Sequence, residues 1–302
     1  MNVEAIRRFR QRAPWIGPLG ALVVVYTLFA IARPQTFLRP LVLLTMAQQT
    51  VIVAICALGM TMIIVTGGID LSVGSLVAFT TVVVAKLLKS GWGPSSAVLV
   101  SLALATAIGA IVGVLVGRVR LMPFVVTLGS MSILRGAAKG LANEQKIDCP
   151  SQGLERLLTT SLSAPGIWIA VFLVVAVAAL LAYTRFGRHV FAVGSNEAAA
   201  RLCGIDTVRV KILVYALASL LAGVAGVMQF STLTVGDPTV SIGLELDVIA
   251  AVVIGGARLE GGEGSVAGAV LGALLMTVIR NGGVFLGMPS WVQEIATGAI
   301  IV

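Results

Sequence analysis

The sequence predicts an all-α membrane protein that crosses the bilayer about ten times. Three observations lead to this fold class: the composition, the length of the apolar runs, and glycine-rich breaks between them. Of the 302 residues, 58% are hydrophobic and 11% are charged, whereas a soluble domain carries about 25% charged residues. The mean hydropathy is +1.04. No polar stretch is long enough for a soluble domain, so we expect one transmembrane domain over residues 1–302.

The apolar runs locate the membrane spans. A spanning helix needs about 20 apolar residues, with a usual range of about 17–25. The fifth, eighth and tenth runs are short, so we expect broken, tilted or incomplete helices there. The predicted spans are residues 15–32, 41–66, 71–88, 97–117, 122–137, 166–184, 212–233, 245–257, 265–287 and 291–302.

The first span follows a basic arm, the charge order that a secretory signal also has. The run is long, however, and Arg33-Pro34 follows it without a clear small-residue cleavage site. We therefore interpret it as a retained membrane helix with a cytoplasmic N-terminus. The arm contains Arg7, Arg8, Arg10 and Arg12.

Loop charges predict the orientation, because cytoplasmic loops are enriched in Lys and Arg. With ten spans, the basic loops fall on the side of the N-terminus, and both ends are then cytoplasmic. Lys86 and Lys89 fall on the other side and count against this assignment. The residues that favour it are Arg118, Arg120, Arg185, Arg188, Arg201, Arg209, Lys211 and Arg258.

The segment between the second and third spans is the first candidate site. Gly67, Gly68, Asp70 and Ser72 interrupt the apolar sequence with flexible and polar residues. Irregular backbone at membrane depth is tolerated only where protein or a water-filled cavity covers it, and an acidic residue beside broken helices indicates a transport pathway. The alternative is that Asp70 or Ser72 caps the helix that follows.

The two halves of the chain echo each other. Residues 66–74, after the second span, resemble residues 234–243, after the seventh. These two spans run in opposite directions, so the repeat would be inverted, as in many transporters. The fourth and ninth spans both carry glycine at every fourth position, which favours close helix packing: Gly109, Gly113 and Gly117 in one, and Gly264, Gly268 and Gly272 in the other.

Further polar residues lie within or beside the spans. Glu245 and Asp247 open the eighth span, where they would offset the helix dipole; coupling to a proton or sodium ion is the alternative. The neutral amides suit a hydroxyl-rich ligand, since an amide both donates and accepts hydrogen bonds, but amides also hold membrane helices together. They are Gln48, Gln49, Asn281 and Gln293. We include Gln48 and Asp247 with the broken segment in the predicted pathway.

The sequence contains no set of residues for catalysis, metal binding or a cofactor. It has no G-x-x-x-x-G-K-[ST] loop, so the chain is not its own Walker-type ATPase. His189 is the single histidine, which excludes a multi-histidine metal site. No G-x-S-x-G elbow is present. The net charge of +8 does not indicate nucleic-acid binding, because the basic residues lie between apolar runs.

Residues 185–211 form a basic cytoplasmic loop and the second candidate site. Ser195 or Asn196 can cap a short helix, and Gly204 can end it. A short exposed helix in such a loop suits docking to a soluble partner; an ordinary interfacial amphipathic helix is the alternative. The residues expected to make this contact are Glu197, Ala198, Ala199, Arg201 and Gly204.

Three motifs resemble the membrane permeases of bacterial ATP-binding-cassette (ABC) importers for ribose, xylose, arabinose and galactose. They are GGIDLSVG at 67–74, NEAAARLCGI at 196–205, and ELDVIAAVVIGG at 245–256 with LEGGEG at 259–264. The resemblance covers nearly the whole chain. The second motif fits the broader E-A-A-x-x-x-G permease pattern only loosely, since its glycine comes one residue late, at Gly204.

The resemblance implies a ten-helix permease of the bacterial inner membrane that works as a dimer with a second copy or a paralogue. It implies a separate ATPase subunit that docks on the loop, a periplasmic sugar-binding protein, and a monosaccharide as substrate. The alternative from the residues themselves is an ion-coupled secondary transporter of a small polar solute, using Asp70 and Asp247. A membrane-embedded enzyme lacks a credible nucleophile or metal set.

Overall fold

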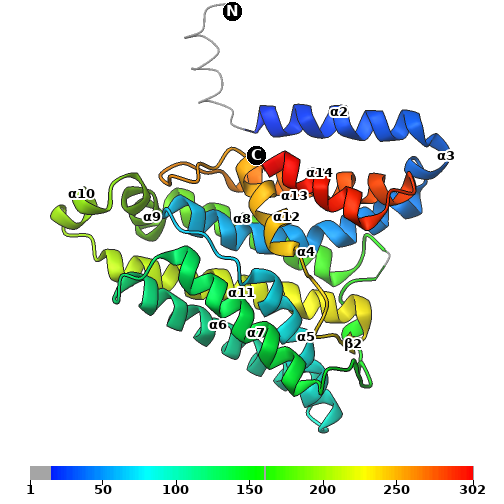
Figure 1. The fold of residues 1–302 in the computed structure, drawn as a ribbon, viewed down its shortest axis with the longest axis horizontal. Helices are drawn as coiled ribbons and strands as arrows, with labels where there is room; N and C mark the ends of the chain where they lie inside the picture. Colours follow the sequence, from blue (N-terminus) through cyan, green and yellow to red (C-terminus); the bar gives the residue numbers. More distant parts are fainter. Residues whose placement is uncertain (1–14, 160, 302) are drawn as a thin grey trace, which may run out of the picture.

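The computed structural model describes residues 15–159 and 161–301 (Figure 1). The basic arm with Arg7, Arg8, Arg10 and Arg12 lies outside the described residues. The described helices are α2 (Ile16–Ala32), α3 (Pro34–Phe37), α4 (Pro40–Val65), α5 (Val73–Lys89), α6 (Pro94–Gly117), α7 (Pro123–Leu141), the short 3-10 helix η1 (Leu154–Arg156), α8 (Pro165–Tyr183), α9 (Arg185–Ser195), α10 (Glu197–Leu202), α11 (Thr207–Leu233), α12 (Leu244–Ile254), α13 (Val266–Phe285) and α14 (Ser290–Ile301).

The all-α membrane class is confirmed. Within the described residues, the strands are confined to β1 (Ile147–Asp148) and β2 (Val235–Gly236), which pair antiparallel. Each predicted span coincides with one helix. In the part of the chain that the structure describes, five helices are long and apolar enough to cross a membrane: α4, α6, α8, α11 and α13. That all ten cross the bilayer stays a prediction.

Proline starts several of these helices. Pro40, Pro94, Pro123 and Pro165 each lie in the first turn of their helix, where the missing N–H would be unpaired anyway. Helix α7 runs to Leu141 and is longer than predicted. By contrast, α12 has 11 residues and is about 16 Å long, roughly half the hydrocarbon thickness of a bilayer.

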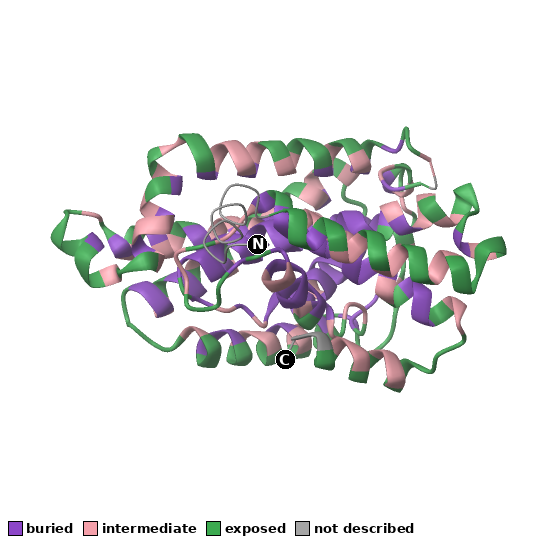
Figure 2. Ribbon diagram, turned by 90° about the horizontal axis from the view of Figure 1, so that it is seen from above, coloured by how far each residue is buried: buried purple, intermediate pink, exposed green. Residues whose placement is uncertain are grey.

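The core is built on α4 and α11, which pack against each other. α11 packs on α6 and α5, and α4 packs on α13 and α12. These two sets of contacts correspond under the predicted repeat, because α4, α5 and α6 match α11, α12 and α13. Figure 2 shows the buried residues gathered in the centre and the exposed ones on the outer helices. The arrangement of contacts supports an inverted repeat.

Both glycine stripes lie at close helix contacts, as the sequence predicts, but their partners differ between the two halves. In α6, Gly109 and Gly113 face the backbone of α11, the central helix of the other half. In α13, Gly268 and Gly272 face the backbone of α12, within their own half. Only Gly264, before α13, lies against Val65 of α4. The reason is that α12 is a short helix wedged beside α13, so the close approach occurs there.

One end of the bundle carries α10 and the other carries the β1–β2 pair (Figure 1). The end of α6 lies near the start of α11, since Gly117 approaches Val208 and Lys211. The end of α9 lies against the end of α4 and the loop before α13, since Gly194 approaches Val65 and Gly262. The basic loops after α6, around α10 and after α12 therefore meet at one end. Lys86 lies elsewhere, where it donates to the Leu141 carbonyl at 3.2 Å.

Gly113→Ala should destabilise the protein, because its Cβ would lie 2.7 Å from the Ile212 Cα on α11. Overpacking of this kind costs about 1–3 kcal/mol. Thermal unfolding of the purified protein in detergent would measure the loss. Gly129→Ala in α7 is the control, since a Cβ added there would meet no atom within 4 Å, and alanine favours a helix by up to about 1 kcal/mol. Equal melting temperatures for the two variants would contradict the close packing of α6 on α11.

Candidate functional site

The first broken segment, residues 66–72, joins α4 to α5 without regular structure. Gly67 has φ +78° and lies near the carbonyl of Glu260, at the end of the bundle that carries α10. The segment then runs inward to Asp70, which is buried. Asp70 Oδ1 accepts hydrogen bonds from Ser72 N at 2.7 Å and from Ser72 Oγ at 2.6 Å. Asp70 thus closes a local turn before α5 instead of capping the helix itself, and the Ser72 side chain does not cap it either.

The second broken segment, residues 237–243, repeats this turn between α11 and α12. Asp237 Oδ1 accepts from Thr239 N at 2.8 Å and from Thr239 Oγ1 at 2.7 Å. Asp237 also pairs with Lys146 at 3.0 Å. The same Asp-x-Ser/Thr turn therefore satisfies backbone groups at equivalent places in both halves. This geometry is the most direct structural sign of the repeat.

The first turns of α5 and α12 face each other inside the bundle. A Cβ on Gly74 of α5 would overlap the Ser241 carbonyl and Glu245 Oε2. Glu245 Oε2 and Ser75 Oγ are buried, and neither has a hydrogen-bond partner in the described part of the chain. Two positive helix ends thus converge on a place that holds one carboxylate and one hydroxyl.

Helix α7 holds both broken segments. Thr127 Oγ1 donates to the Ile69 carbonyl at 3.2 Å. Two turns farther on, Arg135 Nη1 donates to the carbonyls of Pro238 at 3.0 Å and Val240 at 2.8 Å. The sequence interpretation missed Arg135. A lone arginine within an apolar span was the available signal, because such residues face the protein interior and are functional by default.

A polar cavity of about 380 Å³ lies between α4, α11, α12, α13 and the second broken segment. Asp247 of α12 and Arg280 of α13 line it and form an ion pair at 2.9 Å. Gln49 of α4 and Asn281 of α13 also line it, and Asn281 Nδ2 donates to Gln49 Oε1. The remaining lining comes from Ile52, Val53, Gln229, Val240, Ser241, Leu244, Met276, Thr277 and Val284.

The predicted pathway residues fall in different places. Asp247 lines the cavity, whereas Asp70 and Ser72 form the first turn, and Gly67 and Gly68 begin it. Gln48 points away from the cavity, because its Nε2 donates to the Leu158 carbonyl at 3.2 Å. The neighbouring Gln49 takes the cavity position instead. A pathway role for these residues stays a prediction.

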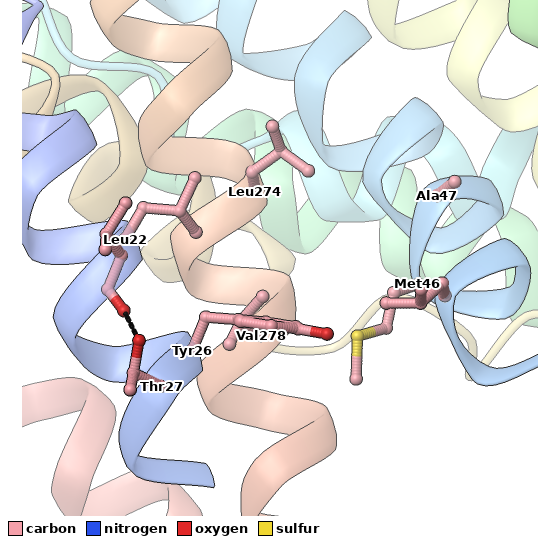
Figure 3. Close-up of a pocket in the computed structure, with 9 residues that line it drawn as sticks. Leu22, Tyr26, Thr27, Met46, Ala47, Leu274 and Val278 are labelled. Atoms are coloured by element: carbon pink, nitrogen blue, oxygen red, sulfur yellow. Dashed lines mark hydrogen bonds between the residues drawn. The ribbon is translucent and has the colours of Figure 1, made fainter. Parts of the chain in front are cut away.

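A second hollow of about 330 Å³ lies between α2, α4 and α13 and is apolar (Figure 3). Leu22, Tyr26, Met46 and Val278 line it. The Tyr26 hydroxyl donates to the Phe37 carbonyl at 3.4 Å, so the hollow offers little to a polar solute. Between the two hollows, the polar cavity is the better candidate for a solute site.

The predicted docking helix exists as α10. Asn196 Oδ1 caps it by accepting from Ala199 N at 2.9 Å. Gly204 ends it with φ +82°, and its N–H donates to Arg201 O at 3.0 Å while Ile205 N donates to Ala200 O at 3.1 Å. This is a Schellman ending, which favours glycine at that position. The glycine that comes one residue late in the sequence motif is therefore the helix stop.

Charges anchor α10 to the bundle. Glu197 pairs with Lys211 of α11 at 2.6 Å and with Arg201 at 3.0 Å. Burial disfavours the charged carboxylate, but the hydrogen bond and charge of Lys211 outweigh it and lower the pKa of Glu197 below its ordinary value. On the free side of α10, Ala198 and Ala199 are exposed, and Leu202 is 90% exposed. Glu197, one of the predicted contact residues, thus faces the bundle and not the free side of α10.

Helix α9 connects α10 to the first broken segment. A Cβ on Gly194 would overlap the Val65 carbonyl at the end of α4. The same carbonyl accepts a hydrogen bond from Gly262 N at 2.9 Å. The end of α9, the end of α4 and the loop before α13 are thus in direct contact.

These features define a helical membrane transport protein with two broken segments and a polar cavity. In the described residues, no group of three or more His, Cys, Asp or Glu side chains is placed to hold a metal ion. The chain belongs to the family described as the permease component of the branched-chain amino acid transport system, whose model matches residues 42–302.

Individual relatives indicate which kind of permease this chain resembles. The chain is 38% identical to the ribose import permease protein RbsC of Escherichia coli strain K12, over 98% of this chain and 94% of that protein. It is 35% identical to RbsC of Bacillus subtilis strain 168, over 95% and 90%. It is 39% identical to the probable ABC transporter permease protein YphD of E. coli K12, over 95% and 87%. No solved structure matches the chain. The resemblance to sugar-import permeases is confirmed, and the chain is a permease subunit, not an enzyme.

Gly68→Val should abolish transport while the protein still assembles, because a Cβ at this position would lie 2.6 Å from Tyr215 Oη. Asp70→Asn should transport nearly normally, since an asparagine Oδ1 can accept both hydrogen bonds of the turn. Uptake by proteoliposomes that contain equal amounts of protein would measure both. Gly129→Val, on open helix surface, is the control for bulk. Full uptake by Gly68→Val would show that the segment is passive scaffold.

Proposed function

We propose that the chain is the permease subunit of a bacterial ABC importer and passes a monosaccharide across the inner membrane. The observation that carries this proposal is the near-full-length similarity to ribose import permeases. The family description names branched-chain amino acids. The cavity wall combines aliphatic side chains with amide, hydroxyl and charged groups contributed by Gln49, Gln229, Ser241, Asp247, Thr277, Arg280 and Asn281. Such groups suit a hydroxyl-rich solute better than an aliphatic side chain.

A separate ATPase subunit docks on α10. Two features support this assignment. The helix projects from one end of the bundle with an exposed leucine, Leu202. The side of the helix that faces the bundle is fixed by the ion pairs of Glu197. A rigid helix with a free apolar tip can transmit force, whereas a mobile loop cannot. Sequence position and burial single out Ala198, Ala199 and Leu202 as the residues that contact the ATPase.

Movement of the ATPase reaches the pathway through α9. Because Gly194 lies directly against Val65 and Gly262, α9 cannot shift without moving the end of α4 or the loop before α13. The end of α4 continues into Gly67, Gly68 and the turn at Asp70. We therefore place the moving part of the pathway at the two broken segments, where the first turns of α5 and α12 meet.

The other partners follow from the importer class. A periplasmic binding protein delivers the sugar to the end of the bundle that carries β1 and β2, and a second permease copy or paralogue completes the membrane unit. Both chain ends lie in the cytoplasm in this arrangement. The gathering of basic loops at the α10 end supports it.

An ion-coupled mechanism has less support. The two carboxylates named for it are engaged, since Asp70 Oδ1 accepts hydrogen bonds from Ser72 and Asp247 is paired with Arg280. Glu245 Oε2 has no partner among the described residues, so the relatives carry the choice between the two mechanisms. The relatives named above are ribose import or ABC permeases. We therefore assign the energy of transport to ATP hydrolysis by the separate subunit.

The complex of this chain with its ATPase and binding protein, reconstituted in vesicles, should import a pentose or hexose only when ATP is present. Leu202→Glu should uncouple it: sugar uptake should fall at least tenfold, because a charge at the docking tip cannot be buried against the ATPase without a partner. Radiolabelled sugar uptake and phosphate release would be measured on the same vesicles.

Leu162→Glu is the matched control, since Leu162 is 66% exposed and lies in the loop before α8. It should leave the coupling of uptake to hydrolysis unchanged. Normal coupling in Leu202→Glu would contradict docking on α10. Uptake driven by a proton or sodium gradient without ATP would contradict the importer class.

Cysteine labelling tests the orientation. Ser195→Cys should resist a membrane-impermeant thiol reagent in intact cells, because the α10 end faces the cytoplasm. Ser163→Cys, exposed in the loop before α8, should react. Cys203 is exposed near α10 and Cys149 is partly exposed beside β1, so both are replaced by Ser in both variants. The reverse labelling pattern would overturn the orientation.

A further inference from the structure

We propose that the polar cavity is a transient binding site for one monosaccharide inside the permease. The Asp247–Arg280 pair and the Gln49–Asn281 pair hold the sugar hydroxyls. This inference rests on the proposed function and adds to it a specific site, since a permease could also pass a sugar through a channel that never binds it.

The position of the cavity suits a step between entry and release. Gln49 precedes Val65, the last residue of α4, by 16 positions, or about 24 Å of helix at 1.5 Å per residue. The cavity is therefore far from the α10 end. Ser241 and Leu244, at the second broken segment and the start of α12, form part of its wall. A movement of this segment would change the shape of the cavity.

The size fits one sugar ring. Pockets for small ligands have volumes of about 300–1,000 Å³, and this cavity, at about 380 Å³, is at the small end of that range. A monosaccharide therefore fits with a few waters.

The side chains offer both donors and acceptors. Asn281 Nδ2 is engaged by Gln49 Oε1 and by the Thr277 carbonyl at 2.9 Å. This fixes both amide planes and leaves Asn281 Oδ1 as an acceptor and Gln49 Nε2 as a donor, neither hydrogen-bonded to another described residue. A sugar hydroxyl donates one hydrogen bond and accepts others. Adjacent hydroxyls can therefore pair with both amides.

The charges cancel, which favours a neutral ligand. The Asp247 side chain is 6% exposed and the Arg280 side chain is 53% exposed. Asp247 Oδ2 lies 2.9 Å from Arg280 Nη2. The carboxylate keeps acceptor lone pairs, and the guanidinium keeps donors that reach the cavity. A free amino acid would bring an ammonium and a carboxylate to groups whose charges already offset each other. An uncharged polyol can use the remaining donors and acceptors without adding charge to the site.

Protection of a cysteine from a small thiol reagent tests the site. Thr277→Cys would be made in the full complex with Cys56, Cys149 and Cys203 replaced by Ser, and its rate of reaction with methyl methanethiosulfonate measured with 0 to roughly 100 mM D-ribose, D-xylose, D-galactose or L-leucine. A transported sugar should slow the reaction at least threefold in a saturable manner. Adding Asn281→Ala should shift half-protection to about tenfold higher sugar, the effect of one or two lost hydrogen bonds.

Leu274→Cys is the matched control. It lies on the same helix one turn earlier, but it lines the apolar hollow beside α2, so sugar should not protect it. ATP-driven sugar import without protection of Thr277→Cys, or with equal protection of Leu274→Cys, would overturn the binding site and leave the proposed function intact. Protection by L-leucine but by no sugar would overturn the ligand class. Failure of the unmodified complex to import any monosaccharide would instead overturn the proposed function.

Discussion

The hydrogen bonds of two buried aspartates make the two broken segments of this permease possible. A membrane protein must pair its backbone polar groups internally, yet residues 66–72 and 237–243 leave helical geometry inside the bundle. Asp70 and Asp237 each bind the N–H and the hydroxyl of a residue two positions later. These turns supply partners that a helix would otherwise provide, and they allow α5 and α12 to begin inside the protein.

Because α5 and α12 begin inside the protein, their positive ends meet there. Helix α7 holds both broken segments. Thr127 binds the first segment and Arg135 binds the second. The contacts are unequal: one hydroxyl holds the first break, whereas a guanidinium holds two carbonyls of the other. The first break is also continuous with the α9 contact at Val65. The first break is therefore the more weakly held of the two, as expected for the segment that we propose to move.

A sugar is neutral and strongly hydrated, so a permease for it needs weak polar groups in place of a charged pocket. The cavity meets this need with an internally neutral ion pair and two fixed amides. A tight site would slow release, and a wholly apolar route would not replace the water that the sugar loses. The apolar hollow beside α2 shows the contrast, since it has similar volume but offers no such partners.

The sequence by itself determined the membrane class, the position of each apolar helix, the broken segments and the short helix α10, because hydrophobic length, glycine and capping residues act locally. It also indicated the repeat at Asp70 and Asp237.

Only the tertiary structure decided which amide lines the cavity. Gln48 and Gln49 are adjacent and chemically identical, but neighbouring side chains on a helix point in directions about 100° apart. Contacts distant in sequence placed Arg135 on the second break and joined Asp247 to Arg280. No local pattern encodes such pairings, since they depend on how helices from the two halves pack together.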